Sequence, residues 1–226
     1  MKLFLTSVSS CLSSIESFKS LINEHTRLVI LPISHHKDYI TCAEDIYNRY
    51  DRCPHNSESI YWRTARPFID SGILPENICV INPYEDPMKY VKYRLTAPNT
   101  IVYLPGGFPE NIVKNIKKFR LSSIIKQIPV LVGESAGSMA PFSSFFVYKD
   151  NDYKRYKSYL GLSLIRKRMT VIPHYEVSNK NIAKACLRYS KTHLFHDIYL
   201  IEDGGYIVFD TEENKMLETH KVHKYK

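Results

Sequence analysis

The sequence predicts an α/β fold of three layers, α/β/α, with a central and mostly parallel sheet. The first observation is a series of short apolar runs rich in β-branched residues, which predict strands at 3–6, 28–32, 78–81, 100–104, 130–132, 170–172 and 206–210. The second is the spacing between these runs, which leaves room for crossover helices at 14–23, 40–50, 110–125 and 179–189. Parallel strands need such crossovers, so the alternation predicts a sheet with helices on both faces.

Length and composition are those of one ordinary globular domain. The chain has 226 residues, of which 44% are hydrophobic and 24% are charged, and these values exclude a disordered, collagen-like or coiled-coil protein. A core of this size needs no metal or disulfide to stabilise it. No repeat or Gly/Ser/Pro-rich linker divides the sequence, so residues 1–226 are predicted to form a single domain.

The charge is basic but dispersed. Lys and Arg total 31 and Asp and Glu total 23, which gives a net charge of +8. Such a charge suits a nucleic acid, an anionic membrane or an acidic small substrate. The basic residues form only short clusters, at 114–120, 154–157 and 166–168, without a basic tail or zinc-finger spacing. We expect no nucleic-acid partner, since that role would rest on the net charge alone.

Cysteine usage and the N-terminus favour a cytoplasmic protein. The five cysteines are odd in number, widely spaced and without a CxxC pair, which argues against a disulfide framework and against a zinc site. The first apolar run, 3–5, is too short for the core of a signal peptide. No stretch approaches the roughly 18 apolar residues of a membrane span, so we expect no membrane partner.

Glycine placement points to one edge of the predicted sheet. Six of the eight glycines fall in three places beside predicted strands, at 106–107, at 133 and 137, and at 204–205. Glycine permits sharp turns and close backbone approach. In an open parallel sheet the first two places lie at the carboxyl edge, where such folds bind ligands.

The candidate nucleophile is Ser135. It is the serine of Gly-Glu-Ser-Ala-Gly at 133–137, which follows an apolar strand and precedes a helix-compatible segment of small residues. This is the context of a nucleophile elbow, which requires small residues two positions before and after the serine. The amide of Ala136 would then face a developing oxyanion. The alternative is a tight strand-to-helix turn with a buried serine.

A histidine and a carboxylate complete the candidate constellation. His174 follows the predicted strand 170–172 in Ile-Pro-His-Tyr, and Glu202-Asp203 precedes the glycine pair at 204–205. A serine nucleophile needs a general base that a carboxylate orients. A hydrogen-bonded structural histidine and an exposed Glu-Asp turn are the alternatives for these residues.

The glycine pair Gly106-Gly107 follows another predicted strand, in Pro-Gly-Gly-Phe at 105–108. Its backbone amides would supply a second oxyanion donor. A phosphate cradle is not favoured, because neither GxGxxG nor GxxxxGK[ST] is present. A plain turn is the alternative.

Together these four motifs, at 105–108, 133–137, 172–175 and 201–208, resemble the dipeptidase E family of serine peptidases, peptidase family S51, which also includes cyanophycinase. The likeness extends over most of the chain. The resemblance implies the class I glutamine amidotransferase-like, flavodoxin-like fold and a Ser135, His174 and Asp203 triad, with Glu202 as the alternative acid. It also implies oxyanion donors at Gly106, Gly107 and Ala136.

The resemblance further implies an activity: a serine-type exopeptidase or dipeptidase that cleaves a small peptide with an acidic N-terminal residue, without a metal or organic cofactor. Arg166 and Arg168, which would share one face of a strand before His174, are the candidates for binding that acidic residue. A solvated basic edge is the alternative for them.

The sequence departs from the family at Phe108, which stands where the family usually has Asn. Phe108-Pro109 is instead similar to amidotransferase domains of the same fold, but those use a cysteine nucleophile, so we do not expect glutamine hydrolysis. The departure favours a rival hypothesis, a catalytically silent binding or regulatory protein. The segment 38–75, with Trp62, either covers the site or forms an oligomer contact, which leaves a homodimer open.

Overall fold

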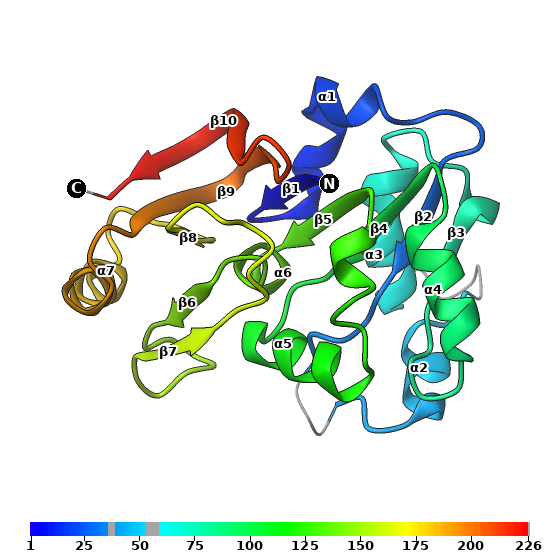
Figure 1. The fold of residues 1–226 in the computed structure, drawn as a ribbon, viewed down its shortest axis with the longest axis horizontal. Coiled ribbons are helices and arrows are strands. Elements are labelled where there is room, and N and C mark those ends of the chain that lie inside the picture. The colour runs from blue at the N-terminus through cyan, green and yellow to red at the C-terminus, as the bar shows by residue number, and fades with distance from the viewer. Residues whose placement is uncertain (36–38, 53–58, 226) are drawn as a thin grey trace.

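The computed structural model describes residues 1–35, 39–52 and 59–225, and its centre is a mostly parallel sheet (Figure 1). Seven of its strands follow the order β10-β9-β1-β5-β4-β2-β3. The eighth strand, β8, also pairs with β9. Along this order, each pair of neighbouring strands from β1 through β5, β4 and β2 to β3 is parallel. Strand β9 runs antiparallel to both of its neighbours in this order, β1 and β10. The strands are β1 Lys2–Thr6, β2 Arg27–Ile30, β3 Ile78–Val80, β4 Thr100–Leu104, β5 Val130–Glu134, β8 Met169–Ile172, β9 Asp197–Asp210 and β10 Lys215–Lys224.

Helices cover both faces of this sheet, and a separate two-stranded antiparallel hairpin packs on one of these faces. The hairpin pairs β6 Ser144–Val147 with β7 Lys157–Leu160. The α-helices are α1 Glu16–Lys19, α2 Ala43–Arg49, α3 Ile60–Ile69, α4 Met88–Thr96, α5 Pro109–Lys118, α6 Ala136–Met139 and α7 Lys180–Thr192. The short 3-10 helices are Ser9–Ser14, Pro75–Asn77 and Ile125–Gln127.

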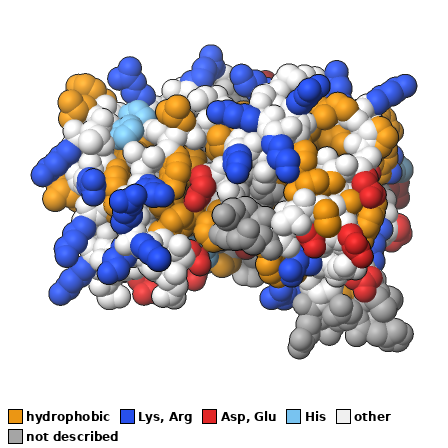
Figure 2. Space-filling view, turned by 90° about the horizontal axis from the view of Figure 1, so that it is seen from below, with side chains coloured by type: hydrophobic (Ala, Val, Ile, Leu, Met, Phe, Trp, Pro, Cys, Tyr) orange, Lys and Arg blue, Asp and Glu red, His pale blue; other side chains and the backbone are white. Residues whose placement is uncertain are grey.

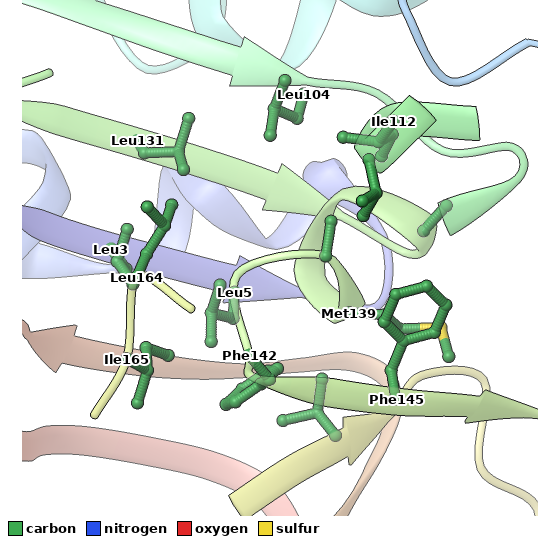
Figure 3. Packing of buried hydrophobic residues seen from close by; sticks show 14 of the residues in the cluster. Leu3, Leu5, Leu104, Ile112, Leu131, Met139, Phe142, Phe145, Leu164 and Ile165 are labelled. Atoms are coloured by element: carbon green, nitrogen blue, oxygen red, sulfur yellow. The ribbon is translucent and has the colours of Figure 1, made fainter. Parts of the chain in front are cut away.

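Alternating strand residues build two cores, one on each face. Leu3, Leu5 and Leu131 belong to the cluster that α4 to α7 and the hairpin cover, while the intervening Phe4 and Val132 face α1 to α3. Side chains of successive strand residues point to opposite faces of the sheet. A strand that is buried on both faces therefore has a continuous apolar sequence. Figure 3 shows the first cluster, where strand leucines meet residues of α5, α6 and the hairpin.

The α/β architecture predicted from the sequence is confirmed, and all seven predicted strands lie in the sheet. The last of them is longer than predicted, since β9 begins at Asp197. The strands β6, β7 and β10 and the helices α3 and α4 were not predicted. The predicted helix 14–23 is also shorter, because only Glu16–Lys19 is α-helical there.

The described parts of 38–75 belong to the helical layer of the second core. Tyr61, Ala65 and Phe68 of α3 are buried against the sheet cluster that contains Phe4. Asp38 and Cys53 lie outside the described residues. This segment therefore contributes core side chains, and the four cysteines that the structure describes are free thiols.

The surface matches the dispersed charge of the sequence. Figure 2 shows Lys and Arg side chains scattered over one face, with Asp and Glu side chains between them. None of the described helices has the length and apolar character needed to cross a bilayer.

The long strand β9 brings three chain segments together. Its residues 206–210 pair with β1, and its residues 197–200 pair with β8. The carboxyl ends of β1 and β8 therefore both arrive at the middle of β9, where Ser7 donates its amide to Gly205 and Tyr175 donates its amide to Ile201. Because β5 lies next to β1, its carboxyl end reaches the same place.

Candidate active site

Ser135 lies in a strained turn between β5 and α6. Its φ and ψ angles are 49° and −109°, a conformation that costs of order 1–3 kcal/mol and is typical of functional sites. The turn is closely packed: a Cβ at Gly133 would lie 2.3 Å from the carbonyl oxygen of Gly137, and a Cβ at Gly137 would lie 2.1 Å from that of Leu104. The small residues predicted around Ser135 are thus a steric requirement.

His174 contacts the candidate nucleophile. Its Nε2 lies 3.0 Å from the Ser135 Oγ, within hydrogen-bonding distance. His174 comes two residues after β8 and also has a positive φ, 55°. The imidazole is about half exposed, so a substrate can reach it.

Asp203 contacts the other ring nitrogen. Its Oδ1 lies 2.7 Å from the His174 Nδ1. The neighbouring Glu202 points away and lies 2.5 Å from the Nε2 of His223, because adjacent strand residues face opposite sides. Of the two candidate acids, Asp203 is the one in contact with His174, and its shorter side chain reaches the ring.

A fourth side chain, Ser7, joins this group and was not predicted. It is fully buried at the end of β1. Its Oγ donates to Asp203 Oδ1 over 2.7 Å and accepts the His174 amide over 2.8 Å, and it lies 3.2 Å from His174 Nδ1. The hydrogen bond from Ser7 to the Asp203 carboxylate is the largest contribution that lowers the pKa of Asp203. The contact with His174 lowers this pKa further.

The predicted oxyanion donors surround Ser135. A Cβ on Gly106 would lie 3.4 Å from the Ser135 Cβ, and Gly107 and Ala136 line the same cavity as Ser135. The amides of these three residues donate to no described residue.

A cavity of about 230 Å³ opens beside Ser135 and His174. It is smaller than the roughly 300–1,000 Å³ of pockets for drug-sized ligands, so its size suits a single residue of a peptide. A larger hollow of about 670 Å³ lies at the β3 edge, but Ser135 and His174 do not line it. Among the described residues no three His, Cys, Asp or Glu side chains come together as a metal site.

Phe108 has a packing role beside this cavity. Its ring meets the ring of Tyr153 edge-on, with centroids 5.7 Å apart, and its amide donates to the Ser34 carbonyl. Tyr153 lines the cavity. The departure from Asn therefore contributes an aromatic support for the cavity wall.

Arg166 and Arg168 do not lie near the candidate nucleophile. Both precede β8, whereas His174 follows it, so the strand separates them from the site. Arg166 donates to the Glu212 carbonyl in the turn between β9 and β10. The structure does not support the prediction that these arginines bind a substrate at Ser135.

The family comparison agrees with this geometry. The model of the family described as peptidase family S51 matches residues 55–217. The chain belongs to peptidase family S51. This confirms the resemblance that the four sequence motifs carry. Among curated proteins, no sequence matches this S51 peptidase.

Two solved structures are similar to this S51 peptidase. A peptidase E candidate from Listeria monocytogenes EGD-e has a TM-score of 0.60 and 17% identity, over 100% of this chain and 98% of the other. A peptidase from an acI-B1 Actinobacterium has a TM-score of 0.59 and 17% identity, over 92% and 82% of the two chains. At this identity the likeness shows the shared flavodoxin-like α/β fold.

Proposed function

We propose that this S51 peptidase is a serine hydrolase that cleaves small peptides through Ser135, His174 and Asp203. The observation that carries the proposal is the continuous hydrogen-bonded line from Ser135 Oγ through the imidazole to the Asp203 carboxylate, with distances of 3.0 and 2.7 Å. The strained turn at Ser135 supports the same role.

The proposed reaction is acyl transfer. The Ser135 Oγ attacks the scissile carbonyl carbon while its proton moves to His174 Nε2, and the carbonyl oxygen becomes an oxyanion. The amides of Gly106, Gly107 and Ala136 would stabilise that oxyanion. The C–N bond then breaks, the imidazole returns the proton to the leaving amine, and an acyl-enzyme remains. Water activated by the same imidazole releases the acid and restores Ser135.

Asp203 would hold the imidazole so that Nδ1 carries its proton towards the carboxylate and the Nε2 lone pair faces Ser135. The lowered pKa of Asp203, caused first by the Ser7 hydrogen bond, keeps the carboxylate charged. A charged carboxylate also stabilises the imidazolium that forms during attack.

An active-site-directed fluorophosphonate tests the proposal. We expect it to label Ser135 in the parent protein and to inhibit dipeptide cleavage. Ser135→Ala should abolish labelling, and His174→Ala should lower kcat by several orders of magnitude, because the two groups act as one unit. A folded parent protein that is not labelled would instead favour the catalytically silent binding protein.

A further inference from the structure

The cavity beside Ser135 has a negatively charged wall. The loop between β6 and β7 supplies Asp150 and Asp152 to the lining. No Lys or Arg is among the described residues that line the cavity. This arrangement is the opposite of what an acidic substrate requires, since like charges in a site repel.

Both carboxylates keep free acceptor capacity. The Oδ1 of Asp150 accepts the amides of Asp152 and Tyr153, at 2.9 and 2.7 Å, which fixes the loop. Its second oxygen, and both oxygens of Asp152, make no hydrogen bond with a described residue, and neither side chain forms an ion pair within the described chain. Two carboxylates without an ion pair among the described residues therefore border the cavity beside Ser135.

Further carboxylates lie close behind this wall. The hydroxyl of Tyr153 donates to Glu110 at the start of α5, over 2.7 Å. Burial raises the pKa of Tyr148 to about 12, with added contributions from Asp150 and Glu176. Carboxylates therefore gather at and behind this cavity wall, although the whole protein carries a net charge of +8.

Three aromatic residues also line the cavity, among aliphatic ones. Phe146, Tyr148 and Tyr153 line the cavity together with the two aspartates. Aromatic faces attract cations through their quadrupole, and carboxylates add charge-assisted hydrogen bonds. An ammonium group satisfies both kinds of contact.

We propose that this cavity binds a cationic ammonium group of the substrate, held by Asp150 and Asp152 against the aromatic wall. The inference rests on the proposed function and gives its site a substrate class. The ammonium group belongs either to a lysine-like side chain or to the free amino terminus of the peptide. It replaces the acidic preference that the family resemblance implies.

A dipeptide series tests the charge preference. If a lysine-like side chain is bound, Lys-Xaa should be cleaved with a kcat/KM about fivefold above that of Asp-Xaa, the upper end of what one exposed ion pair provides. Asp150→Asn and Asp152→Asn, combined, should remove this advantage mainly through KM. Asparagine keeps the Oδ1 acceptor of the loop, so the fold is retained. Equal or faster cleavage of Asp-Xaa by the parent protein overturns binding of a lysine-like side chain, and it overturns the whole proposal if the double variant also leaves the KM of Ala-Xaa unchanged.

Acetylated substrates distinguish the two sources of the ammonium group. If a side chain is bound, N-acetyl-Lys-Xaa is still cleaved and the double variant affects only lysine substrates. If the amino terminus is bound, acetylation stops cleavage of Ala-Xaa, and the double variant weakens every free-amine dipeptide alike. Glu213→Gln is the matched control, because it removes one exposed negative charge in the turn between β9 and β10.

A second measurement does not depend on finding a good peptide. n-Butylamine should slow fluorophosphonate labelling of Ser135 in the parent protein, whereas n-butanol should not, and the double variant should lose this protection. Labelling that n-butylamine leaves unchanged overturns the ammonium site but keeps the serine hydrolase. Absence of labelling overturns the proposed function, and the ammonium site with it.

Discussion

Ser7 is a buried hydroxyl that holds two members of the hydrogen-bonded line from Ser135 through His174 to Asp203. It contacts both the Asp203 carboxylate and the backbone of His174, the residue with positive φ. The sequence contains no signal for this role, because Ser7 is one polar residue after a strand. Its partners are 167 and 196 residues away along the chain, and only the pairing of β9 with β1 and β8 brings them together.

Ser7→Ala should lower kcat by about 10- to 100-fold, since it removes a hydrogen bond to a charged group. KM should change little, because Ser7 does not line the cavity. The variant also loses the main cause of the lowered pKa of Asp203, so the acid limb of the kcat–pH profile should move to higher pH. The same exchange at exposed Ser14 is the control. An unchanged pH profile in a variant with reduced kcat would leave Ser7 a purely structural role.

The choice between Glu202 and Asp203 also belongs to the residue scale. The sequence placed the acid at Glu202-Asp203 but left Glu202 as an alternative to Asp203. The two adjacent carboxylates differ only in the face of β9 that they occupy, and the sequence does not show which face is turned towards His174. Asp203→Asn should lower kcat by roughly 10³- to 10⁴-fold, as loss of a triad acid does. Glu202→Gln should change it by about twofold at most, because Glu202 contacts His223 and not His174. Steady-state kinetics of the two variants checks this, and a larger effect at Glu202 would contradict the contacts with His174.

Among the strands, the buried ones of the central sheet were predictable, whereas the exposed β7 and β10 and the short buried β6 were not. The β4 strand, TIVYL, is buried at every position, so its sequence is uniformly apolar. The β7 strand, KSYL, and the edge strand β10, KMLETHKVHK, are mostly exposed. Their strand state depends on hydrogen bonds to β6 and β9 rather than on burial, and a local apolar pattern cannot report that. The turn at Ser135 was predictable because it requires small residues two positions before and after the serine, and this steric requirement is visible in a short stretch of sequence.

Gly137→Ala tests that steric requirement. The new Cβ would lie 2.1 Å from the Leu104 carbonyl oxygen at the end of β4, so β4 and α6 must separate. We expect the free energy of unfolding to fall by about 3 kcal/mol, the upper range for overpacking, with loss of fluorophosphonate labelling. Urea denaturation measures the first effect.

Gly72→Ala is the control for the exchange itself. Gly72 has a φ of +107°, but its nearest neighbour to a new Cβ is a methyl group at 3.6 Å. Gly72→Ala should lower the free energy of unfolding only by the backbone strain of about 1–2 kcal/mol, and the variant should still be labelled by the fluorophosphonate. Equal destabilisation of the two variants would show that the close approach at the elbow is not the cause.

At the scale of the whole molecule, the two cores share one sheet, and groups buried at the carboxyl edge link its stability to pH. His35 follows β2 near the Gly106 turn and lies 2.8 Å from the Tyr50 hydroxyl. Burial, and then the positive charge of Arg49, lower the pKa of His35 to about 4 from the model-peptide value of 6.5. The folded state therefore holds this imidazole neutral.

The sign of the pH effect follows from proton binding. Between pH 6.5 and about 4 the unfolded chain binds a proton at His35 that the folded chain does not. Stability therefore rises with pH in this window, is fully present above 6.5, and is lost as the pH falls towards 4. Since His35 is partly exposed, the loss should be on the order of 1–2 kcal/mol.

His35→Gln should flatten this dependence, because glutamine keeps a polar group near Tyr50 but does not titrate. Urea unfolding of the parent protein and the variant at pH 7.5, 5.5 and 4.5 measures it, and exposed His25→Gln is the control. The difference in unfolding free energy between the parent and His35→Gln should shift in favour of the variant as the pH falls. A constant difference across the three pH values would mean that His35 takes up its proton equally in the folded and unfolded chains.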